Sequence, residues 1–354
     1  MMDIKQGDAD SFYTDLTEGC KLCQKGSKMV LFVTGLCDKD CFYCPISEER
    51  KESQVYANEQ PISNDSEIIE EAKGMTALGT GITGGEPLLE KELVLHYIHL
   101  LKDTFGRNHH IHLYTATSPD KKTINELAEA GLNEIRFHPP RDIWNIIEGS
   151  TYEKSMSEAK KAGIETGLEV PAIEGVEKLI RFAKEKEYFI NLNELEFSDT
   201  NAEELKKKGY TLVDDISNAV AGSSKIAEEA IGDLRHGHFC SSRYKDAIQL
   251  RKRLIRTAET ISRPLDMVTD DGTVVFGIIH TFYPKKVLET LKNNEVPENL
   301  YEIKANSVEI AAWVLEDIVE QFQDCEKMEI VEKYPIKDGI VVESIPMSNP
   351  KTYK

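Results

Sequence analysis

The residues best suited to chemistry in this chain are its cysteines. There are seven, at positions 20, 23, 37, 41, 44, 240 and 325, and the first five of them fall within 25 residues. The densest group is Cys37, Cys41 and Cys44, which follows an apolar run. Soft thiolates this close together favour zinc, copper(I) or an iron–sulfur cluster. Structural zinc usually takes four protein ligands, so three cysteines on one loop favour a cluster with one iron open to another ligand. Incidental buried cysteines are the alternative.

A second motif, Thr83-Gly84-Gly85-Glu86-Pro87, lies about forty residues further on, at the end of another apolar run. Glycines let a ligand approach the backbone closely, and the glutamate complements the charge of an ammonium group. Taken alone, this segment is equally well explained as an ordinary turn.

Together the two motifs resemble those of the radical S-adenosylmethionine (SAM) superfamily. The loop has the pattern C-x3-C-x2-C with an aromatic residue, Tyr43, before its last cysteine, and the GGEP segment follows it at the next strand end. The resemblance covers residues 28 to about 200 and implies a partial (β/α)6 TIM-like barrel. It also implies that the three loop cysteines bind a catalytic [4Fe–4S] cluster and that the segment from Gly84 to Pro87 holds the amino group of SAM.

The same resemblance implies the reaction. SAM would chelate the fourth iron, and one-electron reduction would cleave it to methionine and a 5′-deoxyadenosyl radical, which abstracts hydrogen from a substrate. A low-potential donor similar to flavodoxin or ferredoxin would supply the electron. Among relatives, the loop and the short barrel look most like pyruvate formate-lyase activating enzymes and an archaeal group related to them. The substrate stays open between a protein or peptide and a small molecule, with an RNA base or a cofactor precursor as alternatives.

Further SAM contacts in this superfamily come from later strand ends. Thr115, Arg136 and Glu169 are the main candidates here. Other residues at predicted strand ends are Thr117, His138 and Glu196. Arg136 and Glu169 are unusual within apolar strands because unpaired buried charge is costly. SAM binding and plain barrel packing are equal alternatives for them.

A second cysteine group consists of Cys20 and Cys23, in a CxxC pattern, and Cys240 with His238 far downstream. A CxxC pair needs one or two more ligands to close a tetrahedral site. One interpretation is an auxiliary iron–sulfur cluster on the three cysteines, with His238 or substrate as fourth ligand. The other is a structural zinc site of all four residues. Iron–sulfur is slightly favoured because the chain must already load a cluster, and unliganded cysteines are the third alternative. Cys325 is predicted to be a core residue.

The elements that must position these residues alternate between strand and helix. Six compact apolar runs are predicted strands, at 28–34, 79–83, 111–116, 133–138, 165–170 and 190–197. Helical periodicity separates them from residue 65 onward. This order predicts an α/β fold with a parallel sheet covered by helices. The pattern alone does not choose between an open sheet and a partial barrel, but in both the chemistry lies at the carboxyl ends of the strands.

The character of the sequence changes after about residue 210. Helical stretches at 216–234, 246–260 and 308–323 surround two hairpin patterns at 267–279 and 329–345. We therefore predict three parts. They are an N-terminal segment with the CxxC (1–27), a radical SAM partial barrel (28–210) and an α+β C-terminal lobe (211–354).

Composition excludes several classes of protein. The 354 residues are 40% hydrophobic and 30% charged, which excludes a disordered chain. With 62 acidic and 43 basic residues the net charge is −19, and such a field repels nucleic acid. A basic run between residues 243 and 263 could bind a phosphate, RNA or an acidic protein, but is more often a solvated helix face.

Two patterns that the sequence lacks, a membrane span and a signal peptide, bear on where the protein is located. No stretch approaches the ~18–20 uncharged apolar residues of a membrane span, and the N-terminus has no signal-peptide pattern, so we expect a cytoplasmic protein. The non-enzymatic alternative is a zinc-binding interaction protein without SAM affinity. It leaves the GGEP segment and the six strand–helix units unexplained.

Overall fold

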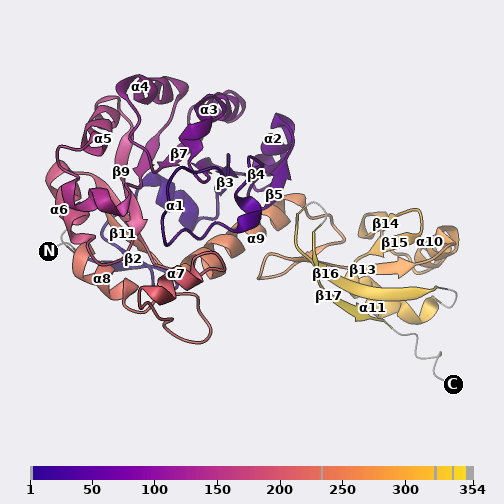
Figure 1. Cartoon of the computed structure of the whole chain (residues 1–354). Coiled ribbons are helices and arrows are strands. Elements are labelled where there is room, and N and C mark those ends of the chain that lie inside the picture. Colours follow the sequence, from indigo (N-terminus) through magenta and orange to yellow (C-terminus); the bar gives the residue numbers. More distant parts are fainter. Residues whose placement is uncertain (1–2, 233, 323–324, 337–338, 348–354) are drawn as a thin grey trace. The chain divides into compact units, whose positions relative to one another are not determined.

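The computed structural model (Figure 1) describes residues 3–232, 234–322, 325–336 and 339–347. The chain forms two compact units, residues 1–73 with 77–250 and residues 74–76 with 251–354. The boundary predicted at residue 210 was wrong, because residues 211–250 belong to the first unit and contribute a strand to its sheet. The N-terminal segment is likewise part of the first unit rather than a separate region.

The first unit is built on a sheet of eleven strands, and seven consecutive strands of this sheet run parallel to one another. The parallel strands, in sheet order, are β3 (Lys28–Phe32), β6 (Gly79–Thr83), β7 (His110–Thr115), β8 (Glu134–Phe137), β9 (Glu165–Pro171), β10 (Phe189–Asn193) and β11 (Gly237–Cys240). The first six confirm the predicted α/β barrel strands. The seventh, β11, pairs with β10 and was not predicted as a strand.

Short antiparallel strands extend the sheet at both edges. Beside β11 lie β2 (Phe12–Tyr13) and then β1 (Lys5–Gln6), and beside β3 lie β4 (Val55–Ala57) and then β5 (Gln60–Ile62). The N-terminal segment therefore adds two strands to the sheet beside β11. The sequence did not indicate these strands.

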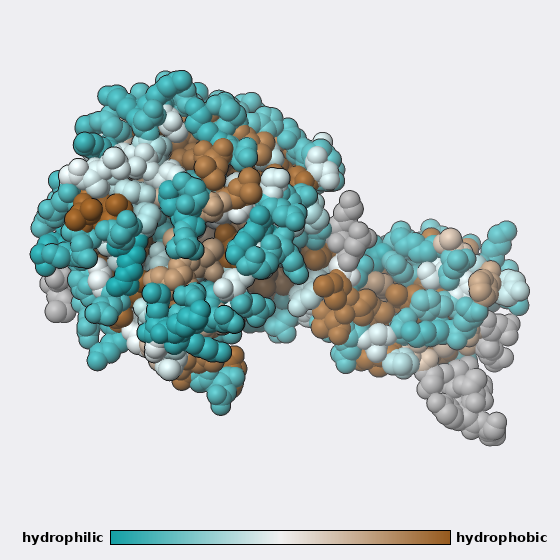
Figure 2. Space-filling model, viewed as in Figure 1, coloured by the Kyte–Doolittle hydropathy of each residue, from teal (hydrophilic) through white to brown (hydrophobic). Residues whose placement is uncertain are grey.

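Helices follow most of the parallel strands and cover the outer face of the sheet (Figure 1). They are α2 (Asp65–Gly74), α3 (Lys91–Phe105), α4 (Lys121–Ala130), α5 (Thr151–Lys161), α6 (Glu177–Lys186), α7 (Ala202–Lys207) and α8 (Ser223–Ile231). In α4, the Asp120 side chain caps the first turn by accepting from the Thr123 amide, and Gly131 ends the helix in a left-handed conformation. Over α4 and α5, the surface in Figure 2 is mostly hydrophilic, as expected for helices with one apolar face.

The two faces of the parallel sheet differ in polarity. Side chains facing the helices, such as Leu31, Ile82 and Leu113, are apolar and fully buried. Alternate residues point to the other face, and there the strands carry buried charged and polar groups such as Lys28 and Arg136. A short helix, α1 (Glu18–Gln24), packs on this inner face against β3, β6 and β7, and Figure 1 shows it enclosed by the strands.

The second unit is an antiparallel sheet with helices. Its strands are β12 (Met267–Val268), β13 (Val274–His280), β14 (Tyr301–Ile303), β15 (Ser307–Ile310), β16 (Lys327–Lys333) and β17 (Val341–Pro346). Its helices are α9 (Arg251–Ile261), α10 (Pro284–Asn293) and α11 (Ala312–Ile318). The predicted α+β character is confirmed.

The predicted details of this unit are confirmed in part. Both hairpin pairings are present, β12 with β13 and β16 with β17, although residues 337–338 of the second turn lie outside the described residues. The helix predicted from residue 308 was wrong at its start, because 307–310 form a strand whose alternate side chains are buried. Cys325 packs against the core of this unit, as predicted, but outside any helix. Among the described residues, no helix is both long and apolar enough to cross a membrane.

Candidate active site

The loop after β3 carries the three cysteines of the main motif. Cys37 is exposed, and Cys41 and Cys44 are half-buried, so all three thiols lie at or near the surface of the first unit. The loop turns back on itself because the Cys44 amide donates to the Cys41 carbonyl at 2.9 Å. The Lys39 amide also approaches the Cys37 Sγ at 3.4 Å.

A hydrogen bond of Tyr43 connects this loop to the opposite part of the sheet. Tyr43 Oη lies 3.0 Å from His138 Nε2, and His138 Nδ1 lies 2.7 Å from the Glu169 carbonyl oxygen. Because a carbonyl can only accept, Nδ1 carries the proton and Nε2 accepts from the tyrosine. Burial lowers the pKa of His138, while the hydrogen bond to the Glu169 carbonyl opposes that shift. The imidazole is therefore a neutral acceptor that fixes the tyrosine and, through it, the loop.

The segment after β10 holds the same loop from another side. Asn201 Nδ2 donates to the Tyr43 carbonyl at 3.2 Å, and Thr200 Oγ1 donates to the Cys44 carbonyl at 3.2 Å. Phe42 stacks on Tyr210 with ring centroids 6.3 Å apart. Strand ends on both sides thus position the cysteine loop.

The glycine pair after β6 lies against the beginning of this loop. The Gly85 amide donates to the Thr34 carbonyl at 2.7 Å. A Cβ on Gly84 would lie 2.4 Å from the Thr34 oxygen, and one on Gly85 would lie 2.4 Å from the Leu36 oxygen. Both distances are too short for any side chain, so the glycines are needed for backbone packing between the two motifs.

Glu86 connects the ends of two neighbouring strands. It is completely buried and accepts hydrogen bonds from Thr115 Oγ1 at 2.8 Å, the Ala116 amide at 2.6 Å and the Leu88 amide at 3.0 Å. Burial raises the pKa of Glu86, and these donors act against that rise. Pro87, also buried, begins the following 3₁₀ turn. Thr115 thus lies with the GGEP segment, and its contact with SAM stays a prediction.

Arg136 and Glu169 lie deeper, on the inner face, and pair with each other. Arg136 Nη1 donates to Glu169 Oε2 at 2.7 Å, and its Nε donates to Glu134 Oε1 at 2.5 Å. Asn191 and Asn193 also donate to the Glu169 carboxylate, at 3.1 and 3.0 Å. The unusual charges of these strands are therefore neutralised by one another, and contact of either side chain with SAM stays a prediction.

The second cysteine group also lies on the inner face. Cys20 and Cys23 are on α1, and Cys240 ends β11. The Arg136 guanidinium approaches Cys20 Sγ at 3.4 Å, and that thiol lies 3.7 Å from Asn191 Oδ1. His238 is buried on β11 beside Tyr13, and burial lowers the pKa of this histidine to about 4. The fold thus brings the N-terminal CxxC and residues 238–240 into one unit.

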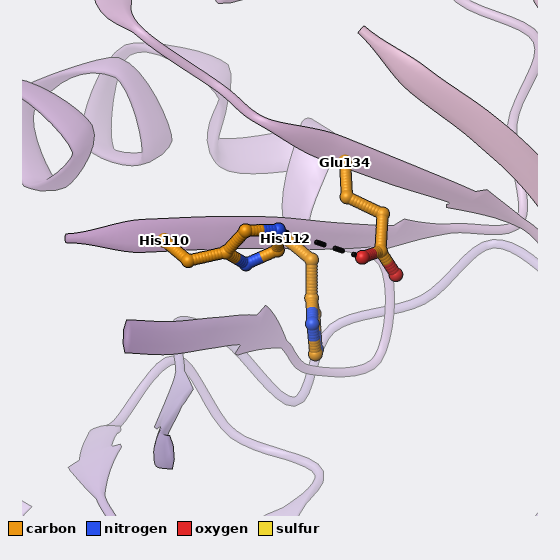
Figure 3. Close-up of side chains that lie close together, drawn as sticks. All are labelled: His110, His112 and Glu134. Carbon is orange, nitrogen blue, oxygen red and sulfur yellow. Dashed lines mark ion pairs between the residues drawn. The ribbon is translucent and has the colours of Figure 1, made fainter. Parts of the chain in front are cut away.

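A further ligand-like group, which the sequence analysis missed, joins β7 and β8. Figure 3 shows His110 and His112 on one strand with Glu134 on the next, and a dashed line from His110 to Glu134, 3.6 Å apart. Their ligand atoms all lie within 4.8 Å of one another. However, Lys28 Nζ contacts His110 Nδ1 at 2.9 Å, and Arg136 binds Glu134, so two cations oppose a metal ion here. The alternation of histidines in the sequence of β7 was the signal for this network.

Comparisons with known proteins bear on the family. Residues 31–177 match the model of the Radical SAM superfamily, and residues 272–347 match a domain of unknown function. A Methanocaldococcus jannaschii protein named "Putative glycyl-radical enzyme activating enzyme" is 39% identical, over 96% of this chain and 95% of its own length. The chain belongs to the radical SAM superfamily. The predicted family, and the expectation of an enzyme, are confirmed.

Solved structures resemble this chain at lower identity. The structure described as "Native anSMEcpe with bound AdoMet" is 17% identical, with 69% of this chain and 72% of its own covered and a TM-score of 0.39. A crystal structure of methylornithine synthase is 14% identical, with 63% of this chain and 72% of its own covered and a TM-score of 0.42.

Membership of the radical SAM superfamily implies a [4Fe–4S] cluster and SAM, and the donor set at the cysteine loop fits the cluster. Three thiols on one short loop are accessible from solvent, and none forms a disulfide. They leave one iron of a four-iron cluster without a protein ligand. The neighbouring Gly84–Gly85 backbone is partly exposed and lies directly against the start of the same loop.

Proposed function

We propose that this chain is an activating enzyme, which removes a hydrogen atom from a partner protein and leaves a radical on it. The observation that carries the proposal is the 39% identity to the Methanocaldococcus jannaschii protein, which is named for the activation of glycyl-radical enzymes. Because that match spans 96% of this chain, it includes both units. It therefore supports a shared class of partner as well as shared cofactor chemistry.

In this proposal, Cys37, Cys41 and Cys44 hold the [4Fe–4S] cluster on the loop after β3. When bound and reduced, the cluster supplies the electron that cleaves SAM to methionine and a 5′-deoxyadenosyl radical. Tyr43 and His138 keep the loop in place through their 3.0 Å hydrogen bond. A low-potential donor of the flavodoxin or ferredoxin type delivers the electron at the exposed side of the loop.

The GGEP segment binds the methionine end of SAM in the same proposal. The partly exposed backbone of Gly84 and Gly85 lies closest to the loop, while Glu86 has no exposed surface. Glu86 therefore contributes negative charge beneath an ammonium group, and Thr115 holds its carboxylate in place at 2.8 Å. Glu169 acts through its carbonyl, which orients His138 at 2.7 Å.

Isotope transfer from a partner protein tests the proposal. The anaerobically reconstituted enzyme is incubated with SAM, a reductant and a glycyl-radical protein labelled with deuterium at its glycine Cα atoms. We expect deuterium in 5′-deoxyadenosine and an organic radical signal on the partner, measured by mass spectrometry and electron paramagnetic resonance (EPR). A partner with alanine in place of the reactive glycine is the matched control.

The result that would contradict the proposal can also be stated. Unlabelled 5′-deoxyadenosine, with no radical on the partner, would contradict protein activation while leaving the radical SAM chemistry intact. The substrate classes then remaining would be a small molecule, an RNA base or a cofactor precursor.

A further inference from the structure

Helix α1 places two thiols on the inner face of the first unit. Cys20 and Cys23 are three residues apart, so they share one face of the helix. That face meets β8 and β10, since Cys20 Sγ lies 3.4 Å from Arg136 Nη2 and 3.7 Å from Asn191 Oδ1. Gly19 makes this close packing possible, because a Cβ there would lie 2.7 Å from the Arg136 guanidinium and from the Glu134 carboxylate.

Strand β11 brings a third thiol to the same place. Asn191 pairs with His238, and Asn193 pairs with Cys240. Asn191 and Asn193 share one face of β10, since both donate to the Glu169 carboxylate. Asn191 also contacts Cys20, so Cys240 lies on the strand next to this cluster. The π-helical segment after β11, Tyr244–Leu250, packs against α1 from this side.

Three cations surround these thiols. Arg136 donates to Cys20, Lys28 lies near Cys23, and Lys245 lies near Cys240. Arg136 and Lys245 also pair with carboxylates, those of Glu134 and Glu196 among them.

Lys28 differs from the other two cations. It is 4% exposed, its hydrogen bond goes to the neutral imidazole of His110, and among the described residues it makes no ion pair with a carboxylate. A buried ammonium is costly unless anionic groups lie nearby. The Glu134 carboxylate is one such group, and a thiolate at Cys23 would be a second.

The ionisation of the thiols agrees with this arrangement. Burial raises the pKa of Cys20 to about 11, while the Arg136 guanidinium acts in the opposite direction. Burial also raises the pKa of Cys23, and Lys28 opposes it. A bound metal takes cysteines as thiolates, which would add negative charge beside Lys28 and Arg136.

The spacing of the sulfur atoms argues against a single zinc ion. A zinc ion bonds sulfur at about 2.3 Å, so it would hold three thiolates within about 4 Å of one another. Across the described parts of the chain, the group of three ligand atoms that all lie within 4.8 Å is His110, His112 and Glu134, not the cysteines. A cluster binds each cysteine at a different iron and so takes sulfur atoms that are further apart.

We propose that Cys20, Cys23 and Cys240 bind a second iron–sulfur cluster on the inner face of the sheet. This site is separate from the cysteine loop after β3. His238 shares the Cys240 face of β11 and is the protein residue placed to serve as a fourth ligand. The proposal concerns metal binding alone and does not depend on the identity of the substrate.

Metal analysis of a chain without the loop cysteines tests the proposal. With Cys37, Cys41 and Cys44 all replaced by alanine, anaerobic reconstitution should still give about four irons and four sulfides per chain. The reduced sample should give an EPR signal that SAM does not change. Adding Cys240→Ala should remove this iron, whereas adding Cys325→Ala, which alters a cysteine of the second unit, should not.

Two further measurements keep the test independent of misfolding. The unsubstituted chain should bind about eight irons rather than about four. Lys28→Met keeps all three thiols but removes a positive charge, so it should shift the potential of the SAM-insensitive signal to a more negative value. One equivalent of zinc in place of iron, or about four irons in the unsubstituted chain, would overturn the proposal.

Discussion

Cys41 lies between the other two cysteines of its loop, yet the loop is tied to the sheet by different residues. Tyr43, Thr200 and Asn201 make the hydrogen bonds that fix the backbone. We therefore expect Cys41→Ala to abolish formation of 5′-deoxyadenosine while leaving the far-UV circular dichroism spectrum unchanged. Cys325→Ala is the control and should stay active. Production of 5′-deoxyadenosine by Cys41→Ala would contradict the cluster assignment.

Tyr43 allows a finer test at the same scale, because phenylalanine keeps the ring and removes only the hydroxyl. The change breaks the hydrogen bond to His138 Nε2 and leaves that half-buried acceptor without its tyrosine partner. We expect Tyr43→Phe to lower the free energy of unfolding by about 1–3 kcal/mol and to retain iron less firmly against a chelator. Denaturant unfolding and the rate of iron loss measure the two effects, with Tyr13→Phe as a matched control. Equal rates of iron loss would show that Tyr43 does not position the loop.

The charged residues of the inner face show how much could be predicted for single residues from the sequence. Arg136 and Glu169 stood out in the sequence because each interrupts an apolar strand, and in the structure Arg136 is buried and the Glu169 side chain is only 12% exposed. Their main partners are each other, Glu134 and two asparagines, which come from separate strands. The sequence did not indicate that Lys28 is buried, because a lysine at the start of a strand is usually exposed. Partners that distant in sequence follow from strand order and register, not from spacing.

At the scale of elements, the end of β6 and the start of the cysteine loop depend on each other. A Cβ on Gly85 would lie 2.4 Å from the Leu36 oxygen and 2.6 Å from the Gly35 oxygen, both backbone atoms that cannot rotate away. Gly85→Ala should therefore displace the loop, cost about 1–3 kcal/mol and reduce iron bound after reconstitution. Gly74→Ala, where no atom lies within 4 Å of the added Cβ, is the control. Full iron content in Gly85→Ala would refute this coupling.

In the second unit, one carboxylate joins three strands. Glu329 on β16 accepts from His280 on β13 at 2.7 Å and from Ser344 on β17, and it pairs with Lys327 at 2.6 Å. Burial alone would raise the pKa of Glu329, but Lys327, Ser344 and His280 together lower it to about 2. Because the folded-state pKa is depressed, this stabilisation is present above about pH 4.5 and is lost as the pH falls toward 2.

Replacing Glu329 tests that pH dependence. Glu329→Gln should lower the stability of the second unit at pH 7 by about 1.5–3 kcal/mol and flatten its change between pH 4.5 and 2. Thermal unfolding at a series of pH values measures this, with the exposed Glu343→Gln of β17 as control. An unchanged pH profile would show that these contacts do not form in solution.

Prediction of the elements succeeded where the periodicity was strong. Six strands of the parallel sheet were found from apolar runs, and the helices predicted between them from residue 65 onward are present. The four-residue strand β11 was missed because so short a run carries no clear period. The position of α1 inside the sheet was also not predictable, since seven residues of helix do not reveal which face of a distant sheet they will cover. These two elements carry the second cysteine group, so its location became visible only in the structure.

For the whole molecule, the two compact units predict two unfolding transitions in calorimetry. Each unit has its own sheet and its own core, so a single two-state description should not hold. Both cysteine groups, the loop after β3 and the set on α1 and β11, belong to the first unit. A cluster that binds only the folded state stabilises the part that holds it. Iron loading should therefore raise the midpoint of one transition, and Glu329→Gln should lower the midpoint of the other. A shift of both midpoints in either experiment would show that the units unfold together.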